Sequence, residues 1–469
     1  MSEKETKDKK NDNVFANVTM VMMLYLILFL ILISYIAHFK LFKSEAWVNS
    51  PYNLRAALKR DEVLRGSIYD RNGEVLAYSE REGNDQTRIY KKGEILAPLL
   101  GYVNPTYDVA GLESSLDERL STSPVSSTVK KMVGLDKEEK KGNDITLTID
   151  SRLQEFAYYL FGYRKGAVVV IDCWTGEILA DVSKPSYDVN NLDVIWEQIV
   201  NDENAPLLDR GINGLYAPGS TFKIITLASA LTNLPDVTSR IFEDNGAIVF
   251  QDGNVLPNYE WIPYGNIDLY RAFAVSSNVV FGGLGIELGG ERLKEEAEAF
   301  NYNRVIKCDD IDISKANFPT LYDEEKGKVA QSAIGQGEVL VSPLQIALTA
   351  GVIANNGVMP HVQIVKGNGA ASSDRIISEG IAIQIKDMMR EVMISGTGQG
   401  FDIYDIGMCG KTGTAEVESQ EGMVVNSLFA GFSSYDNPRY AIAVVVERGE
   451  SKSALSIATE VLYKAMTLE

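Results

Sequence analysis

The chain has 469 residues, enough for two or three domains, and a formal net charge of −19, which repels the phosphates of nucleic acids. We therefore expect no nucleic acid among its partners. The three cysteines lie far apart, so no disulfide framework or paired metal motif is evident. Only two histidines are present, His38 and His361, which leaves little for a zinc site or a Ser-His-Asp triad. We expect no metal or other cofactor, and scarce histidine points any serine chemistry toward lysine.

The first forty residues have the pattern of a membrane anchor. Residues 1–12 are polar, whereas residues 13–39 carry no charged side chain and are long enough to span a bilayer as a helix. Ser44-Glu45-Ala46 resembles a signal cleavage site, but the apolar run is too long for a usual signal core, and Lys40 and Lys43 intervene. Lysines before the span slightly outnumber the basic residues just after it. This bias favours a single-pass anchor in the plasma membrane, with residues 1–12 in the cytoplasm and the bulk of the chain outside.

The region after the anchor has the features of a small separate domain. Residues 53–65 have the pattern of a charged helix, a stalk that leaves the membrane. Two short apolar runs flank Asn72-Gly73, a pair that predicts a hairpin with a type I′ turn. A helical pattern starts at Gly111 and runs to Leu120, and residues 121–141 are then polar, as in a linker. We place the domain boundary just after this linker, which gives a stalk or pedestal at residues 40–144 and a main domain at residues 145–469.

The main domain alternates strand and helix patterns. Ser151 and Gln154 fit a capping box at the start of a helix that follows a strand at residues 145–149. Ser342 and Pro343 are an N-cap serine and an N1 proline, with Gln345 as the capping glutamine, and they predict a helix to about residue 354. Further elements are a hairpin at 167–182, a helix at 381–393 that stops at Gly396, strands at 428–433 and 440–446, and a final helix at 454–466. These elements predict a mixed α/β domain.

One stretch of the main domain combines a turn with a possible nucleophile. Pro218-Gly219 precedes Ser220, and an apolar run that suits a buried helix follows. Lys223 lies on the same helical face as Ser220, so the two side chains can touch. A lysine activates a serine hydroxyl only when its amine is neutral, and burial and the helix dipole both lower the pKa of a lysine at this position. A second S-x-x-K, at residues 127–130, leads into a polar stretch, and we interpret it as solvated surface.

Two more short motifs follow in the chain. Ser276-Ser277-Asn278 is the only S-x-N, although such a turn can also merely satisfy its own backbone at a helix end. Lys411-Thr412-Gly413 is the only K-T-G, and Asp405 stands where a phosphate-binding loop ending here would need glycine. The order S-x-x-K, S-x-N, K-T-G is that of the penicillin-recognising serine transpeptidases and β-lactamases.

From the anchor to nearly its last residue, the chain resembles a class B penicillin-binding protein, a monofunctional peptidoglycan D,D-transpeptidase of the short elongation, division or sporulation type. The matching residues are Arg65-Gly66 with Asp70 to Gly73, Gly111-Leu112-Glu113, Pro218 to Lys223, and Lys411 to Glu416. The resemblance implies an α+β, β-lactamase-like transpeptidase domain. Its mainly antiparallel sheet would be flanked by helices, and a small dimerisation-like pedestal and one transmembrane helix would precede it.

The same resemblance implies the catalytic roles. Ser220 would attack the carbonyl between the two terminal D-alanines of a stem peptide, and Lys223 would take its proton. Ser276 would relay a proton to the departing amine, with Lys411 nearby to tune that relay.

Substrate binding is implied for four further residues. Asn278 would bond the amide of the donor peptide, and Gly413 would let the substrate backbone approach closely. Thr412 and Thr414, with the charge of Lys411, suit the terminal carboxylate of the substrate. The backbone N–H groups of Ser220 and Thr414 would form the oxyanion hole.

The implied partners are peptidoglycan stem peptides, β-lactam antibiotics that stall at the acyl stage, the plasma membrane, and a membrane glycan polymerase of the elongation or division machinery. One alternative is a β-lactamase or β-lactam sensor built on the same site. Glu298 is the carboxylate that could activate a deacylating water, but its place in a helical pattern at 292–300 indicates helix surface. A second alternative is a catalytically silent scaffold for the polymerase, against which the intact Ser220 and Lys223 argue.

Overall fold

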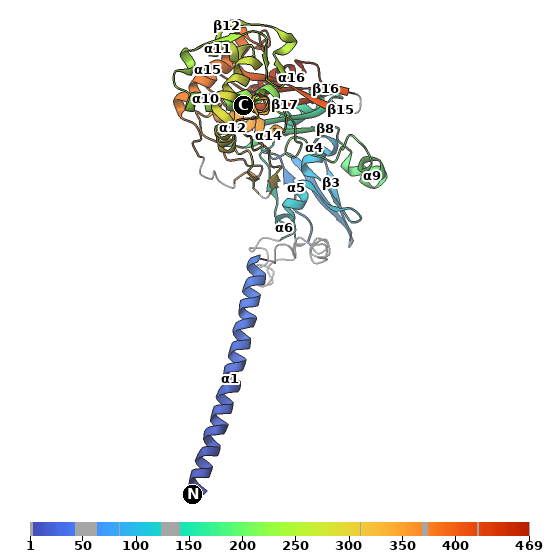
Figure 1. The fold of residues 1–469 in the computed structure, drawn as a ribbon. Helices are drawn as coiled ribbons and strands as arrows, with labels where there is room; N and C mark the ends of the chain where they lie inside the picture. Colours follow the sequence, from blue (N-terminus) through green and yellow to red (C-terminus); the bar gives the residue numbers. More distant parts are fainter. Residues whose placement is uncertain are drawn as a thin grey trace. The chain divides into compact units, whose positions relative to one another are not determined.

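The computed structural model describes residues 3–42, 63–83, 85–122, 141–309, 311–367, 374–419 and 422–468. The chain divides into two compact units, Met1–Val63 and Leu64–Glu469. The first unit contains one continuous helix, α1 (Glu3–Phe42) (Figure 1). Its stretch Asn17–Lys40 has a mean hydropathy of 2.7 and buries none of its side chains, so it is long and apolar enough to cross a membrane. Of the predicted stalk helix, residues 53–62 lie outside the described residues, as do residues 127–130 of the second S-x-x-K.

The second unit begins with a small four-stranded sheet in the order β3-β2-β1-β6. Strand β1 pairs with β2 antiparallel and with β6 parallel. Strand β6, at residues 145–146, belongs to this sheet although it follows residue 144, and the predicted domain boundary at that residue stays a prediction. The elements of this pedestal are β1 (Ile68–Tyr69), β2 (Val75–Glu82), β3 (Asp85–Tyr90), α4 (Gly93–Leu100), β4 (Val103–Asn104), β5 (Asp108–Val109), α5 (Gly111–Ser115), α6 (Asp117–Leu120) and β6 (Ile145–Thr146).

Two local predictions for the pedestal need correction. The hairpin β1–β2 is present, but its turn is not type I′, because only Gly73 (φ 88°) and not Asn72 has a positive φ. The carboxylate of Asp70 accepts hydrogen bonds from the backbone N–H groups of Asn72 and Glu74, both at 2.8 Å, and so organises a longer loop. The predicted helix at 111–120 is divided at Leu116 into α5 and α6.

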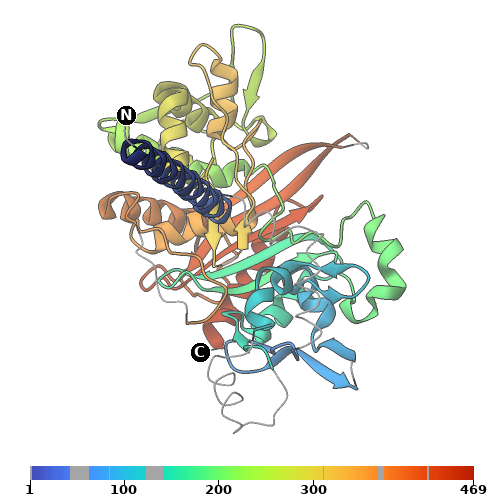
Figure 2. The same ribbon diagram turned by 90° about the horizontal axis from the view of Figure 1, so that it is seen from below.

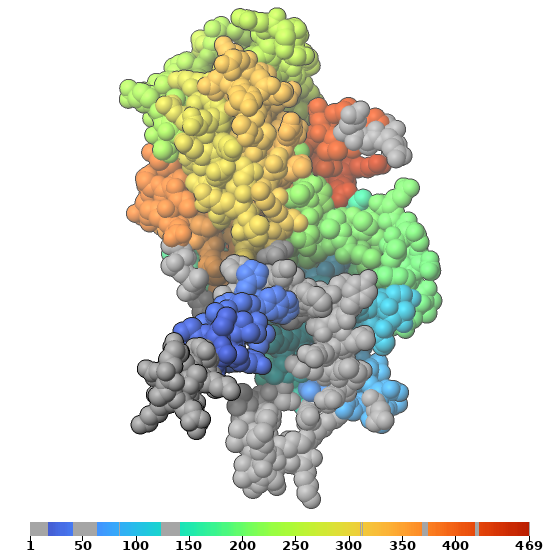
Figure 3. All heavy atoms as spheres, turned by 60° about the horizontal axis from the view of Figure 1, so that its bottom comes forward, coloured from blue at the N-terminus to red at the C-terminus, as the bar shows by residue number. Residues whose placement is uncertain are grey.

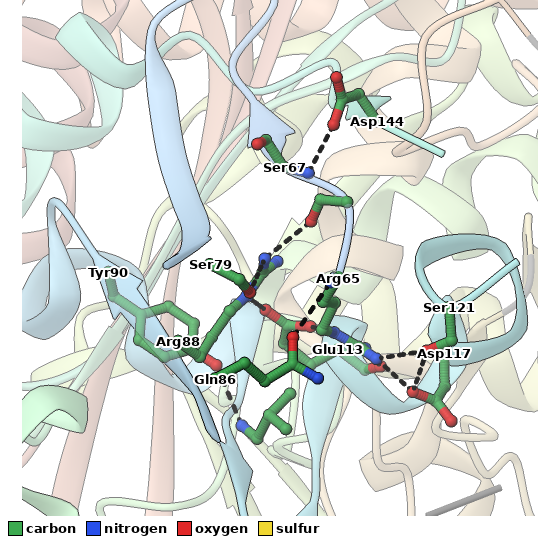
Figure 4. A network of polar contacts seen from close by, with 12 residues as sticks. Arg65, Ser67, Ser79, Gln86, Arg88, Tyr90, Glu113, Asp117, Ser121 and Asp144 are labelled. Atoms are coloured by element: carbon green, nitrogen blue, oxygen red, sulfur yellow. Dashed lines mark hydrogen bonds and ion pairs between the residues drawn. The ribbon is translucent and has the colours of Figure 1, made fainter. Parts of the chain in front are cut away.

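A network of buried charges holds the pedestal together (Figure 4). Glu113 is fully buried and accepts from Arg65 Nε at 2.6 Å and from Arg88 Nε at 2.7 Å, one arginine on each carboxylate oxygen. Arg65 also contacts Asp117 and donates to Ser121 Oγ at 3.0 Å. Buried charges persist when they are paired and hydrogen-bonded, so this cluster fixes α5 against the first strands.

The larger part of the second unit is built on a five-stranded antiparallel sheet in the order β15-β16-β17-β7-β8. Helices α8 and α16 pack on each other and on one face, and α14 packs on the other face (Figures 1 and 2). The sheet and its covering helices confirm the predicted mainly antiparallel sheet flanked by helices. The elements are β7 (Lys165–Asp172), β8 (Ile178–Lys184), β15 (Cys409–Ser419), β16 (Gly422–Ser433), β17 (Tyr440–Glu447), α8 (Ser151–Phe161), α14 (Pro343–Ala354) and α16 (Ser453–Thr467).

A mostly helical region adjoins the β15 side of this sheet, and residues around 280–330 (yellow) form a broad part of its surface (Figure 3). Two-stranded ribbons β9–β12, β10–β11 and β13–β14 accompany its helices. The elements are η2 (Gly219–Phe222), α10 (Lys223–Asn233), η3 (Val237–Ser239), β9 (Ile241–Asp244), β10 (Ala247–Val249), β11 (Val255–Pro257), η4 (Tyr259–Trp261), β12 (Gly265–Asp268), α11 (Leu269–Ala274), α12 (Asn278–Ala299), β13 (Ile306–Cys308), β14 (Ile311–Ile313), α13 (Lys326–Ala333) and α15 (Glu379–Ser395). A further helix, α9 (Leu192–Val200), follows η1 (Val189–Asn191) on the pedestal side.

Most predicted elements of the main domain are confirmed, and the misses are at their ends. The capping box at Ser151 is wrong, because Asp150 is the N-cap and Ser151 Oγ instead donates to Asp70 at 2.7 Å. The predicted strand at 145–149 is reduced to β6 and a bridge at Leu147. Ser342 caps α14 as predicted, whereas the side chain of Gln345 donates to the carbonyl of Phe300 at 3.0 Å.

Candidate active site

Ser220 lies on a tight turn at the start of a buried helix, as predicted. The first turn, η2, is a 3-10 helix, and α10 continues from Lys223. Gly219 has φ 52°, and its N–H donates to the carbonyl of Gly335 at 2.9 Å. A Cβ on Gly219 would lie 2.4 Å from the carbonyl oxygen of Thr414, so only glycine allows this close approach of the turn to β15. Ser220 itself is partly exposed.

The amine of Lys223 is fully buried and faces the S-x-N motif. Its Nζ lies 2.7 Å from Ser276 O, 2.7 Å from Asn278 Oδ1 and 3.2 Å from Ser276 Oγ. The amine donates to the carbonyl oxygen of Ser276 and to Asn278 Oδ1, and its contact with the Ser276 hydroxyl is close enough for proton transfer between the two groups. Within the described residues, Lys223 makes no side-chain hydrogen bond to Ser220. Ser220 and Lys223 are therefore neighbours along the helix without a hydrogen bond between their side chains, an arrangement that is common for catalytic pairs in the absence of substrate.

Burial shifts Lys223 toward the uncharged form, which is the form that a base requires. Loss of hydration on burial lowers the pKa of Lys223 well below its usual value, and the neighbouring charge of Lys411 lowers it further. The buried carboxylate of Asp244 acts in the opposite direction. No carboxylate of a described residue forms an ion pair with the amine, so burial prevails.

Lys411 is the second fully buried amine of the site. Its Nζ lies 5.5 Å from the centre of the Phe273 ring and donates to the carbonyl of Thr412 at 3.3 Å. Lys223 Nζ lies 5.7 Å from the ring of Phe281, and the two rings are themselves 5.7 Å apart. Burial lowers the pKa of Lys411 to about 7. Each amine thus lies beside one of two neighbouring aromatic rings, and burial shifts the pKa of both lysines downward.

The K-T-G motif lies on β15, the edge strand of the large sheet, and packs against the Ser220 turn. A Cβ on Gly413 would lie 2.9 Å from Thr221 Cγ2 and 3.1 Å from Pro218 O, so a side chain there would push the strand away. The carbonyl of Thr414 points toward the turn, where Gln336 Nε2 donates to it at 3.4 Å. The N–H and C=O of an antiparallel strand residue point to the same side, so the Thr414 N–H also points away from β16.

Ser276 and Asn278 face Lys223, whereas the middle residue of the motif has a structural role. Ser277 caps α12, because its Oγ accepts from Val280 N–H at 3.0 Å, which is the backbone role that such a turn often has. Ser276 has φ 61°, a left-handed conformation that is uncommon outside glycine. This conformation directs both its carbonyl and its hydroxyl toward Lys223.

The structure also brings in residues that the motifs do not contain. Thr397 Oγ1 lies 2.6 Å from Thr412 Oγ1, and its N–H donates to Ala274 O at 3.0 Å. Its glycine neighbours, in Gly396-Thr397-Gly398, were a usable sequence signal for a constrained loop. Asp244 and Asn258, which lie behind the S-x-N turn, carry no such signal.

Comparisons with known proteins agree with this geometry. The family model of the penicillin-binding protein transpeptidase domain matches residues 166–467, and that of the penicillin-binding protein A dimerisation domain matches residues 65–145. The chain is 29% identical over 447 residues to the peptidoglycan D,D-transpeptidase PbpA of Mycolicibacterium smegmatis, which covers 87% of this chain and 89% of that protein.

Solved structures give the same result. The D,D-transpeptidase domain of a peptidoglycan glycosyltransferase from Eggerthella lenta aligns with a TM-score of 0.77 and 31% identity, over 87% of this chain and 99% of that one. The imipenem acyl-enzyme of penicillin-binding protein A from Mycobacterium tuberculosis aligns with a TM-score of 0.79 and 27% identity, over 86% of this chain and 99% of that one. The chain therefore belongs to the penicillin-binding protein transpeptidases, as a class B peptidoglycan D,D-transpeptidase with a dimerisation domain before its catalytic domain.

Proposed function

We propose that Ser220 is the nucleophile of this transpeptidase and that neutral Lys223 is its base. The observation that carries this assignment is the position of the Lys223 amine, within hydrogen-bond reach of Ser276 and Asn278 while the K-T-G strand packs on the Ser220 turn. The low pKa of the buried amine supports it, since a lysine base must be uncharged at the working pH.

The reaction proceeds through an ester on Ser220. Lys223 takes the hydroxyl proton as Ser220 Oγ attacks the carbonyl between the two terminal D-alanines of a donor stem peptide. Collapse of the tetrahedral intermediate breaks the amide bond, and the departing D-alanine amine takes a proton that passes from Lys223 through Ser276 Oγ, 3.2 Å away. An amine of a neighbouring stem peptide then attacks the ester and gives a proton to Lys223. The ester C–O bond breaks, Ser220 Oγ takes that proton back from Lys223, and a new amide cross-link remains.

Backbone and side-chain donors of the groove bind the donor peptide. The N–H groups of Ser220 and Thr414 form the oxyanion hole, where loss of a donor costs about 10²–10³ in rate. The terminal carboxylate binds to the hydroxyls of Thr412 and Thr414 and to Lys411, whose pKa of about 7 leaves the amine partly charged at neutral pH. Asn278 bonds the donor amide, and Gly413 leaves room for the substrate backbone.

β-Lactams acylate the same serine and are released slowly. The β-lactamase alternative requires a carboxylate beside the acyl ester, and Glu298 does not supply it. Glu298 lies on α12, where its Oε1 accepts from Asn303 Nδ2 at 3.3 Å, and in the described part of the chain its side chain makes no hydrogen bond or ion pair with a site residue. Rapid turnover of penicillin by the purified protein would contradict the transpeptidase assignment.

The apolar helix supports a membrane location for the enzyme. A span at Asn17–Lys40 would tether the catalytic domain at the outer face of the plasma membrane, where its substrate is assembled. A membrane glycan polymerase is the expected partner, because a transpeptidase and the enzyme that makes its glycan strands act on the same nascent polymer.

Covalent labelling of the full chain in detergent with a fluorescent penicillin tests the assignment directly. We expect stable labelling of the wild type and complete loss in Ser220→Ala. The matched control is Ser127→Ala, in the other S-x-x-K of the chain, which should label like the wild type. Labelling that persists in Ser220→Ala would disprove the assignment of Ser220 as the nucleophile.

A further inference from the structure

A buried carboxylate lies directly behind the S-x-N turn. Asp244, the last residue of β9, is fully buried. Its oxygens accept from Ser277 Oγ at 2.5 Å, from Asn258 Nδ2 at 2.7 and 3.0 Å, and from Gly246 N–H at 2.9 Å. Three separate donors converge on one acid, which is how proteins retain a buried charge.

Asn258 connects this carboxylate to the first turn of α12. Its Nδ2 donates to Asp244, so its Oδ1 faces the other way and accepts from the N–H groups of Asn278 (2.8 Å) and Val279 (3.1 Å). These N–H groups belong to the helix start, where the backbone lacks internal partners. The orientation of the Asn258 amide is therefore fixed by Asp244, and Asn258 in turn fixes the backbone of Asn278.

Ser277 makes the second connection. Its hydroxyl donates to Asp244 and accepts from Val280 N–H, so the same side chain caps α12 and ties it to β9. Ser276 and Asn278, on either side, are the residues that contact the Lys223 amine. Asp244 thus holds Ser277 directly and Asn278 through Asn258. Held in this way, the turn presents three oxygens of Ser276 and Asn278 to the Lys223 amine.

The charge of Asp244 also bears on the two buried amines. The charged groups that act on Lys223 are Lys411, from β15, and Asp244, from β9; its α12 neighbours Asn278 and Phe281 are uncharged. Lys223 must hold a proton after it activates the serine and release it later to the leaving amine. The negative charge of Asp244 favours the charged form of Lys223 that exists between these two steps.

We propose that Asp244, acting through Asn258 and Ser277, is a positioning residue that holds Ser276 and Asn278 against Lys223 and supplies the counter-charge for the protonated amine. This proposal rests on the proposed roles of Ser220 and Lys223. It assigns a task to β9 and to the loop after β11, which lie outside all three motifs.

The test is the rate of acylation by a fluorescent penicillin as a function of pH in Asp244→Asn. This change keeps the size of the side chain and removes its charge. We expect acylation to slow by about 10²-fold, because small misplacement of reacting groups has such effects. The acidic limb of the pH profile should also move to lower pH, since Lys223 loses the negative charge that favours its protonated form.

Two more variants separate positioning from charge and from general stability. Asn258→Ala keeps the carboxylate and removes the bridge, so it should slow acylation and leave the acidic limb in place. Asp323→Asn is the matched control, because Asp323 Oδ1 also accepts from a backbone N–H of α12, that of Gly290 at 2.9 Å, far along the helix from Ser276. It should acylate at the wild-type rate.

The outcomes decide the proposal separately from the assignment of Ser220. Wild-type acylation in both Asp244→Asn and Asn258→Ala, or an equal loss in Asp323→Asn, would overturn the role of Asp244. If Asp244→Asn does not fold, wild-type acylation in Asn258→Ala alone overturns it. Labelling that persists in Ser220→Ala would instead disprove the proposed function.

Discussion

The pedestal and the candidate active site both bury cations, but among the described residues the cations are paired with acids in the pedestal and not in the site. In the pedestal, Arg65 and Arg88 each contact an oxygen of Glu113, and Arg65 also contacts Asp117 (Figure 4). Burial lowers the pKa of Arg65, but the two carboxylates more than offset this, so the net shift is upward. In the candidate active site, Lys223 and Lys411 are as deeply buried as Arg65, and within the described residues neither lysine forms an ion pair.

The difference shows how one chain separates structural charge from reactive charge. A guanidinium stays protonated in any folded protein and suits bidentate pairing, so buried arginine with matched acids gives a permanent connection. An ammonium loses its proton readily when it is buried without an acid, so the same burial makes lysine a base. Among the described acids, Asp244 is the one that acts on Lys223, and it reduces the downward shift of the lysine pKa without cancelling it.

The largest effect is expected when Lys223 of the candidate active site is replaced by arginine, the residue that carries the buried charge in the pedestal. Lys223→Arg keeps a positive side chain that cannot become neutral, and we expect acylation by fluorescent penicillin to fall by about 10²–10⁴-fold, the usual contribution of a general base. The matched control is Lys184→Arg. Lys184 is half-buried, lies 3.6 Å from the Tyr158 ring centre and donates to Gly162 O. The control should acylate normally, and an active Lys223→Arg would contradict the neutral-base mechanism.

The next effect concerns the pedestal. Glu113→Gln removes the charge shared by Arg65 and Arg88 and should lower the free energy of unfolding by about 3–5 kcal/mol, because both arginines then lose the buried carboxylate that neutralises them. Asp117→Asn removes a partner that is 20% exposed and should cost about 1 kcal/mol or less. Denaturant unfolding measures both changes. Folded Glu113→Gln should still acylate at the wild-type rate, and a loss below that of Asp117→Asn would show that the network contributes little.

This contrast also explains what the sequence could predict. Short motifs with fixed spacing, such as Ser220 with Lys223, are local and can be read from one chain, and so can helices with strong caps such as Ser342. The charges that tune the site are not local. Asp244 lies on a short ribbon strand with no distinctive pattern, and only packing brings it beneath Ser277.

The local errors have the same origin. Ser151 is as good a capping residue as Asp150, and the choice between them depends on the hydrogen bond from Ser151 Oγ to Asp70, a residue of the pedestal. The turn at Asn72-Gly73 likewise departs from type I′ because the Asp70 carboxylate accepts from the loop. Where a polar side chain has a distant partner, propensity alone predicts the element but not its boundary.

The last prediction concerns the pH dependence of stability, where the effect is small for each pH unit and accumulates over several. The pKa of Lys411 is about 7 in the folded protein and 10.5 in its ordinary state, so the unfolded chain binds more protons between these values. The free energy of unfolding of the wild type should therefore gain up to about 1.4 kcal/mol per pH unit from this residue as pH rises from about 7 to about 10. Lys411→Met should lose this gain. Removing the charge of Lys411 also lets the pKa of Lys223 return toward its usual value, which further flattens the dependence of stability on pH.

Denaturant unfolding at a series of pH values measures the difference between the two proteins. Lys326→Met, which changes an exposed lysine of α13, should keep the wild-type slope. If the free energy of unfolding depends on pH in the same way in the wild type and in Lys411→Met, Lys411 keeps its proton when buried. The candidate active site would then hold a permanent cation, as the pedestal does.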